Sequence, residues 1–192
     1  MKKKLLLGLV ALSLVAFAGC KKEEAPVEAE EKKFTLEEET PSEEVTEKAN
    51  TQLNYILYLR FEDQEYLYDE MFSVKEEDID LENQSLEAFL VQQLIDVVPV
   101  RNLISPIPEG TKLLGVEKAD GIVTVNLSKE FNPNGLKKNE AGLALASIVN
   151  TLTLIDGNEQ VKILIEGEEV KDYYGVAVDS PLYYIDSYFP DK

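Results

Sequence analysis

The 192-residue sequence contains no histidine and no tryptophan, and it has one cysteine. Without histidine the chain can build no Ser-His or Cys-His nucleophile pair, no imidazole metal site and no histidine general base. One cysteine forms neither an intramolecular disulfide nor a cysteine-rich zinc site. These absences exclude the commonest catalytic and metal-binding arrangements, and they favour a binding function over catalysis.

Basic side chains are also scarce, with 19 Lys and Arg against 37 Asp and Glu and a formal net charge of −18. A nucleic-acid-binding surface needs clustered positive charge to neutralise phosphates. The sequence therefore predicts no nucleic-acid partner. Residues 51–192 alone hold 26 acidic and 11 basic side chains. An anionic domain near an anionic membrane should stand away from it and face outward partners.

The N-terminus has the pattern of a secretory signal. A basic start, Met1 to Lys4, precedes an uncharged and mainly apolar run from Leu5 to Gly19. This run is shorter than the roughly 18 to 20 apolar residues that span a bilayer as a helix. We therefore expect residues 1–19 to be a signal peptide, separate from the folded domain.

The single cysteine, Cys20, stands directly after Phe17-Ala18-Gly19. These four residues resemble the lipobox of bacterial lipoproteins, in which small residues precede a cysteine that is acylated, for example with palmitate, and becomes the mature N-terminus. The resemblance implies lipidation of Cys20 and attachment to the extracytoplasmic face of the cell membrane, where two or three acyl chains anchor a protein stably. A buried or unpaired cysteine after an ordinary signal peptide is the alternative.

The segment from Lys21 to Asn50 holds eleven glutamates, five lysines and few apolar residues. It cannot bury enough apolar surface to offset the entropy cost of ordering. We predict that residues 20–50 comprise the lipidated cysteine and a flexible acidic tether. An acidic interaction tail, or a helix over Lys32 to Lys48, is the alternative.

Residues 51–167 show the periodicities of a folded domain. Alternating apolar residues from Leu53 to Leu59 predict a strand, and Tyr66 to Val74 predicts a second one that Asp69-Glu70 interrupts. A helix capped by Asn83 or Ser85 and bounded by Pro99 should follow. Its buried face is predicted to consist of Leu86, Phe89, Leu90, Leu94, Val97 and Val98.

The second half of the domain repeats this order. Lys112 to Ala119 and Ile122 to Leu127 predict a hairpin, because Asp120-Gly121 can take the positive φ angles of a two-residue turn. A second helix from Glu140 to about Ile155 and a last strand from Val161 to Ile165 complete the domain. The order ββαββαβ predicts an α+β fold, a small mixed β-sheet with two helices packed on one face.

The C-terminal extension, residues 168–192, holds five of the nine tyrosines. A binding surface is one interpretation, since tyrosine is enriched at interfaces. We favour packing of the extension on the open sheet face or along an edge strand, because untethered tails rarely keep so many large apolar groups.

No motif for catalysis or cofactor binding is present. The sequence lacks G-x-G-x-x-G, G-x-x-x-x-G-K, G-x-S-x-G and S-x-x-K, and we predict no catalytic residue, cofactor or metal site. The acidic run from Glu76 to Glu82 lacks the glycine and the spacing of a calcium loop, so a solvated loop is expected. A two-carboxylate glycosidase is the alternative.

Three segments suggest a family. They are Ala119 to Phe131 (ADGIVTVNLSKEF), Ile148 to Thr153 (IVNTLT) and Val161 to Gly167 (VKILIEG), preceded by Ile107 to Leu114. Together they resemble the GerMN domain of sporulation and spore germination proteins, over about Thr51 to Gly167. The resemblance implies a non-catalytic extracytoplasmic domain in envelope assemblies of Gram-positive bacteria, similar in layout to the ring-building domains of sporulation complexes.

Three functions follow as hypotheses. The first is a lipid-anchored interaction or scaffold module that binds an envelope protein or associates with itself. The second is a lipoprotein that binds a small ligand or a cell-wall fragment, and the third is an enzyme that uses carboxylates. For the first, we expect the interface along a helix face or an exposed edge strand, because open sheets of this size leave edges that invite pairing.

Overall fold

The computed structural model describes residues 51–190. The predicted signal peptide, the predicted lipidation site Cys20 and the predicted tether lie outside the described residues. Within residues 51–190, no helix is both long enough and apolar enough to cross a membrane.

The domain begins with an antiparallel hairpin of β1 (Gln52–Phe61) and β2 (Tyr68–Lys75). The expected interruption at Asp69-Glu70 is wrong, because β2 continues through both residues. Asp69 pairs with Tyr58 on β1 and its side chain is exposed, as the alternation of a half-buried strand allows. The Glu70 carboxylate lies 3.2 Å from Nη1 of Arg101 and so finds a partner of opposite charge.

The first helix, α1 (Leu86–Asp96), starts where the sequence indicates. Ser85 Oγ accepts a hydrogen bond from the main-chain N–H of Ala88 at 3.1 Å, which is a standard N-terminal cap. The helix ends before Pro99, and the predicted core position Val98 is wrong. Its side chain is 80% exposed, because the chain has left helical geometry by that residue. A short 3-10 turn, η1 (Glu76–Asp78), precedes this helix.

One strand was not expected in the loop that follows α1. Strand β3 (Leu103–Ile104) pairs with Arg60 and Phe61 at the far end of β1. The chain reverses just before it through Arg101 and Asn102, whose φ angles are 48° and 66°. Two non-glycine residues in the left-handed region give no strong sequence signal for a turn.

The second half contains a mixed sheet. Strands β4 (Leu113–Ala119) and β5 (Ile122–Leu127) form the predicted hairpin, with φ of 51° at Asp120 and 78° at Gly121. A 3-10 turn, η2 (Lys129–Phe131), leads to α2 (Lys138–Thr153), and β6 (Gln160–Ile165) then runs parallel to β5. The two-residue strand β7 (Glu168–Glu169) pairs with the end of β6.

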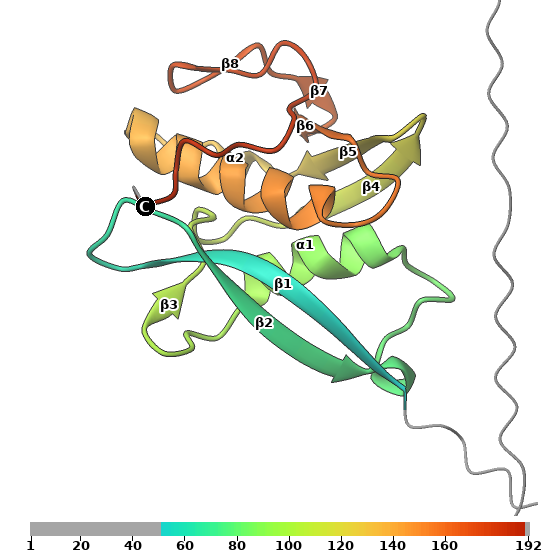
Figure 1. Ribbon diagram of the computed structural model, residues 1–192. Coiled ribbons are helices and arrows are strands. Elements are labelled where there is room, and N and C mark those ends of the chain that lie inside the picture. Colours follow the sequence, from blue (N-terminus) through green and yellow to red (C-terminus); the bar gives the residue numbers. More distant parts are fainter. Residues whose placement is uncertain (1–50, 191–192) are drawn as a thin grey trace, which may run out of the picture. The chain divides into compact units, whose positions relative to one another are not determined.

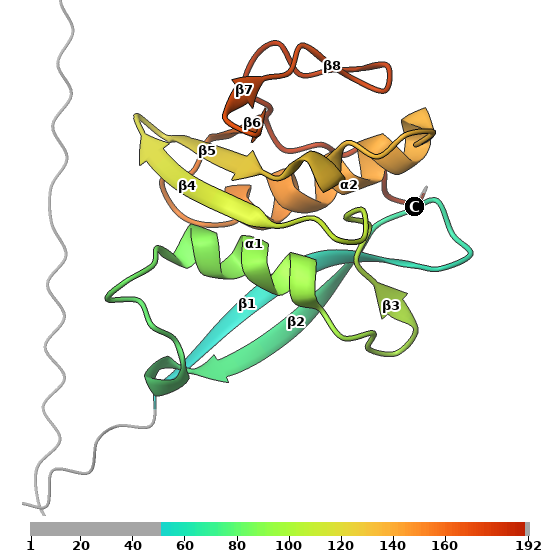
Figure 2. The same cartoon turned by 180° about the vertical axis from the view of Figure 1, so that it is seen from behind.

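The α+β class is confirmed, but the strands do not form one sheet. Strands β2, β1 and β3 form one sheet and β4 to β7 another, with a two-stranded hairpin of β8 (Asp172–Tyr173) and β9 (Val176–Ala177) beyond them. Both helices contact both larger sheets: α1 contacts β1 and β4, and α2 contacts β1 and β6 (Figures 1 and 2). The helices therefore share one core with strands of both sheets, of which Leu57, Leu59, Leu94, Val125, Leu145, Ile148 and Val161 are members.

The C-terminal extension lies against the domain along α2 and β6. Leu182 exchanges two main-chain hydrogen bonds with Val161 on β6, at 2.9 and 2.8 Å. The buried Asn150 side chain on α2 binds Ile185 twice: its Nδ2 donates to the Ile185 carbonyl, and its Oδ1 accepts from the Ile185 N–H, both at 2.8 Å. Gly142 leaves room for the Tyr188 ring, which any side chain at position 142 would overlap.

An ion pair between a buried carboxylate and an exposed lysine joins α1 to the second sheet. Glu87 is 7% exposed, and its Oε1 accepts a hydrogen bond from Lys118 Nζ at 3.3 Å. Burial by itself raises the pKa of Glu87, but hydrogen bonds from its own main-chain N–H and from the Lys118 ammonium outweigh burial and lower the pKa.

The lowered pKa of Glu87 predicts an acid-dependent loss of stability. A carboxyl group whose pKa is lower in the folded state stabilises the fold above its unfolded pKa, about 4.3, and this contribution disappears as the pH falls through the folded pKa. We expect Glu87→Gln to cost about 1 kcal/mol at pH 7. The variant should lose less stability than the wild type between pH 5 and pH 2. Urea titrations across this range measure the effect, and the exposed control Glu117→Gln should follow the wild type.

Candidate functional site

Side chains of α2 occupy the place of a neighbouring strand beside β1. The N–H of Tyr58 donates to Thr151 Oγ1 at 3.3 Å, and the carbonyl of Tyr58 accepts from Ser147 Oγ at 2.6 Å. Ser147 and Thr151 lie one helical turn apart, and both are buried. These two bonds satisfy the main chain of β1 at Tyr58 without a neighbouring strand.

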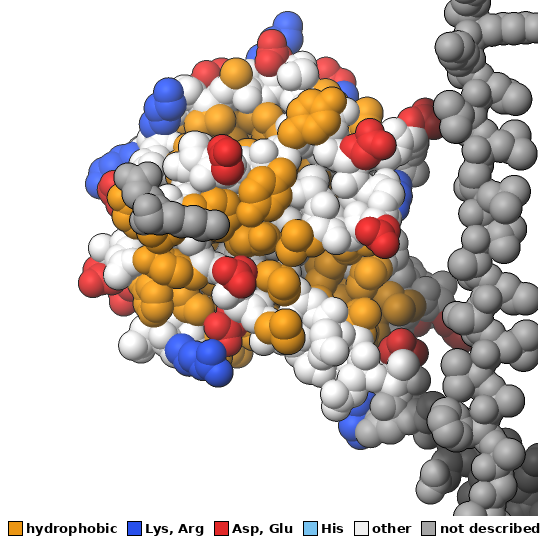
Figure 3. Space-filling view, viewed as in Figure 1, with side chains coloured by type: hydrophobic (Ala, Val, Ile, Leu, Met, Phe, Trp, Pro, Cys, Tyr) orange, Lys and Arg blue, Asp and Glu red, His pale blue; other side chains and the backbone are white. Residues whose placement is uncertain are grey.

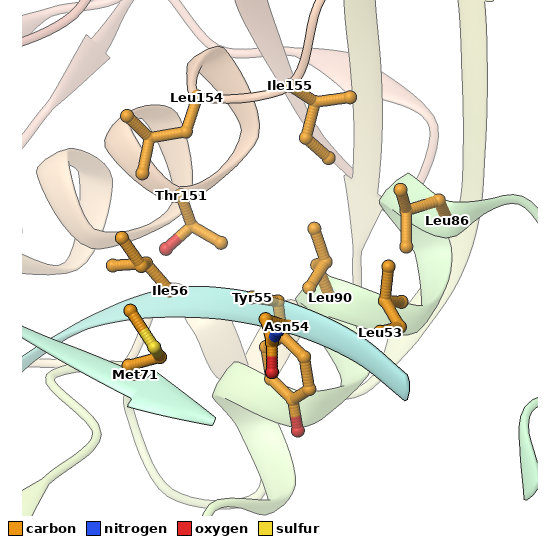
Figure 4. Close-up of a pocket in the computed structure, with 10 residues that line it drawn as sticks. All are labelled: Leu53, Asn54, Tyr55, Ile56, Met71, Leu86, Leu90, Thr151, Leu154 and Ile155. Carbon is orange, nitrogen blue, oxygen red and sulfur yellow. The ribbon is translucent and has the colours of Figure 1, made fainter. Parts of the chain in front are cut away.

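A groove opens beside β1 on the N-terminal side of Tyr58. Its cavity has a volume of about 240 Å³ and lies between β1, the end of α2 and the start of α1 (Figure 4). The sequence alternation of β1 supplies lining residues from both of its faces. Ten residues line the groove: Leu53, Asn54, Tyr55, Ile56, Met71, Leu86, Leu90, Thr151, Leu154 and Ile155.

The groove is apolar and accessible. None of its lining residues is charged, and two of them are unusually exposed for their type, Met71 at 68% and Leu154 at 47%. The close-up shows Ile56 and Met71 together at one side of the opening, with Leu154 above them (Figure 4). Large exposed apolar groups around a hollow mark sites that bind protein segments or ligands.

A second hollow lies at the other end of β1, against the C-terminal extension. Tyr58, Tyr184 and Phe189 form its aromatic wall, with ring centroids 5.5 Å apart for Tyr58 and Phe189 and 6.0 Å apart for the stacked pair Tyr184 and Phe189. Two exposed carboxylates, Asp69 and Asp186, also line it. Aromatic faces beside carboxylates are suited to bind a cation.

Tyr58 of this hollow is not an acid-base group at neutral pH. Burial raises the pKa of Tyr58, and the hydrogen bond with Tyr184 Oη (3.2 Å) and the charge of Asp69 raise it further. The Tyr58 phenol therefore keeps its proton and acts as a hydrogen-bonding group. The hollow can hold a polar or cationic ligand.

The carboxylates of the described domain form no cluster that suits metal binding. Among residues 51–190, no group of three or more Asp, Glu or Cys side chains could hold a metal ion. Glu87 is the one buried carboxylate of this part of the chain, and Lys118 pairs with it. In the acidic run, Asp80 accepts hydrogen bonds from Asn83 Nδ2 at 3.0 and 2.8 Å.

Sequence reasoning found only part of these features. Cys20, the one site residue predicted, lies outside the described residues. A binding surface on the tyrosine-rich extension is one interpretation of the sequence, and Tyr184 lines the aromatic hollow. The groove beside β1 was missed, because its residues come from four separate elements. Its one sequence signal is Thr151, which belongs to the stretch Ile148 to Thr153 that resembles the family.

The comparisons with known proteins agree with this fold. The family model described as "Germane: Sporulation and spore germination" matches residues 56–171, more than half of the chain. The comparison with curated protein sequences finds no match.

Two similar solved structures come from the sporulation protein GerM of Bacillus subtilis. The structure of its first GerMN domain is 21% identical with a TM-score of 0.54, and the match covers 69% of this chain and 95% of that one. The structure of its tandem GerMN domains has the same identity and TM-score, and covers 70% of this chain but 45% of the tandem chain. At this identity the likeness establishes the fold alone. Because the family model spans most of the described domain, the chain belongs to the GerMN (Germane) family of sporulation and spore germination.

Proposed function

We propose that this protein is a lipid-anchored interaction module that binds another protein of the bacterial envelope. It would be non-catalytic, face the extracytoplasmic side and contribute to a sporulation or germination assembly. Membership of the GerMN family supports the biological setting, since the family description names a process and no reaction. The lipid anchor rests on the sequence around Cys20.

The observation that carries the proposal is the accessible apolar groove beside β1. Met71 and Leu154 hold large apolar surfaces in solvent at its opening. Keeping such groups exposed is unfavourable, by roughly 25 cal/mol for each Å² of apolar surface that burial would remove from water. A protein partner that covers the groove would bury these side chains and so stabilise the complex, which supports an interaction function.

The anchor makes a separate prediction. Replacing Cys20 with alanine removes the only thiol that can be acylated, so the variant should lose nearly all membrane retention, a change of tenfold or more in the ratio of membrane-bound to soluble protein. Cell fractionation measures this ratio, and incorporation of labelled palmitate should disappear in parallel. A Phe17→Leu control should keep both. Continued membrane retention of Cys20→Ala would contradict the lipid anchor.

Crosslinking in intact cells tests the interaction function. A photoreactive amino acid is placed at several exposed positions of residues 51–190 in the membrane-bound full-length chain. Adducts of defined mass should form with an envelope protein and should be absent from cells that express only residues 1–50. Absence of adducts from every position on the domain would overturn the proposal.

The aromatic hollow favours a second candidate function, the binding of a cell-wall fragment that carries a free amino group. Tyr58, Tyr184 and Phe189 offer ring faces, and Asp69 and Asp186 offer negative charge to an ammonium group. Muropeptides should then raise the melting temperature in proportion to the logarithm of their concentration. The Asp186→Asn variant should remove this shift, whereas unchanged melting of the wild type would eliminate the candidate.

A further inference from the structure

The hydrogen-bonding direction of β1 can be assigned residue by residue. In an antiparallel pair, alternate residues direct both their N–H and C=O groups toward the partner strand or both away from it. Tyr58 directs both groups toward α2, where Thr151 and Ser147 bind them. The Thr51 carbonyl instead accepts from Glu76 N–H, on the β2 side. Even-numbered residues of β1 therefore face away from β2.

Asn54 and Ile56 are the outward-facing residues of β1 that lie beside the groove. The other outward-facing residues toward the end of β1 have partners: Tyr58 is bound by α2, and Arg60 pairs with Ile104 of β3. Asn54 and Ile56 line the groove, and among the hydrogen bonds of residues 51–190 none joins their main-chain groups to α2. This part of β1 is an unpaired strand edge of the kind that accepts another strand.

The walls of the groove suit an extended segment. Leu53 and Ile56 point to opposite faces of β1, and Met71 of β2 pairs with Ile56. Leu90 and Ile155 line the cavity with them. Successive side chains of a strand point to opposite faces. A strand paired with Asn54 and Ile56 would therefore place alternate side chains in the apolar cavity and over Met71, while its main chain binds the edge.

Charge decides which segment fits. The face of the domain in Figure 3 carries hydrophobic and acidic side chains across its middle, with Lys and Arg toward the outline. Residues 51–192 hold 26 acidic against 11 basic side chains, and Lys21 to Asn50 holds eleven glutamates against five lysines. The net negative charge of the domain repels a second copy of the domain and the chain's own acidic segment, and it attracts a basic segment.

We propose that the groove beside β1 binds an extended, basic segment of an envelope protein as an added β-strand. The main chain of Asn54 and Ile56 pairs with it, and an aliphatic side chain of the segment occupies the cavity. This proposal rests on the interaction function above and names the surface and the chemistry of the partner.

Two peptides test the proposal with the acylated full-length chain in detergent micelles. Both are ten residues long and alternate isoleucine with a charged residue, lysine in one and glutamate in the other. The lysine peptide should bind at least tenfold more tightly, and more weakly as salt rises. On binding, the amides of Asn54 and Ile56 should become protected from hydrogen exchange, which a non-specific ionic contact would not do. Equal affinities, or protection elsewhere, would overturn the proposal.

Matched variants locate the binding surface. Leu154→Arg places a positive charge at the groove and should weaken the lysine peptide at least tenfold, while Leu114→Arg on the edge of β4 should not. The two leucines are 47% and 48% exposed, so the two substitutions are matched in exposure. The Ile56→Pro variant loses the outward N–H of residue 56 but keeps the hydrogen bonds to β2. Its affinity for the lysine peptide should therefore also be lower than that of the wild type. Equal effects of Leu154→Arg and Leu114→Arg would contradict the assignment.

The other occupants give distinct results. If the chain's own acidic segment fills the groove, deletion of residues 30–48 will deprotect Asn54 and Ile56 in the peptide-free protein. If a second copy fills it, the wild type will be a dimer and Leu154→Arg a monomer. Either result overturns the proposal. In cells, a photoreactive amino acid at position 154 should crosslink to the envelope protein. Crosslinks that form only from other surfaces would refute this binding site but would leave the interaction function intact.

Discussion

Replacing Tyr173 with alanine is expected to lower the free energy of unfolding by about 3–5 kcal/mol. Tyr173 belongs to the C-terminal extension but is 2% exposed. Its ring stacks on Phe131 with centroids 4.8 Å apart, and its hydroxyl donates to the Phe131 carbonyl. Truncation would leave a large cavity and an unpaired buried carbonyl, and both are costly.

A tyrosine from the same extension provides the control. Tyr183 is 67% exposed, and its replacement with alanine should change stability by less than about 0.5 kcal/mol. Urea denaturation of the full-length chain, followed by circular dichroism, compares the two variants. Equal stabilities would show that the extension is not part of the cooperative fold, contrary to its packing in the structure.

The double variant Ser147→Ala, Thr151→Val should cost about 2–5 kcal/mol, because it leaves both main-chain groups of Tyr58 buried without partners. The two substitutions preserve most of the side-chain volume, so the loss reports the hydrogen bonds more than packing. The Tyr58 amide should exchange with solvent at least tenfold faster in this variant. Hydrogen-exchange mass spectrometry and urea denaturation measure the two effects.

Thr153→Val on the same helix is the matched control. Thr153 Oγ1 donates to the Val149 carbonyl of its own helix at 2.8 Å, so its hydrogen bonding stays within α2. Its substitution should leave the Tyr58 amide protected and change stability by less than about 1 kcal/mol. Equal exchange of the Tyr58 amide in both variants would show that α2 does not replace a neighbouring strand.

Local patterns in the sequence predicted most elements of the domain. The hairpin at Asp120-Gly121 follows from two adjacent residues that tolerate positive φ, and the start of α1 follows from the Ser85 cap. The errors have physical causes. Strand β3 depends on a turn at Arg101 and Asn102 that lacks glycine, and β2 tolerates Asp69-Glu70 because one side chain faces solvent and the other meets Arg101.

The candidate site was much less predictable. Thr151 and Ser147 have no local signature of their role, since each binds a residue about ninety positions away in the sequence. Leu53, Leu90 and Ile155 each fit a buried face of their own element. Only their convergence around β1 produces a groove, and convergence is a property of the packed domain.

The absence of histidine and the single cysteine decided by composition alone which reactive groups this chain cannot build, because such groups must be encoded as residues. The periodicities decided the helices and strands, since these depend on neighbours within one turn or one alternation. Tertiary structure alone decided that side chains of α2 take the place of a neighbouring strand at Tyr58 but not at Asn54 and Ile56. Side chains of a helix reach β1 over one turn, and the twisted strand extends beyond it, so Asn54 and Ile56 are left at an open edge.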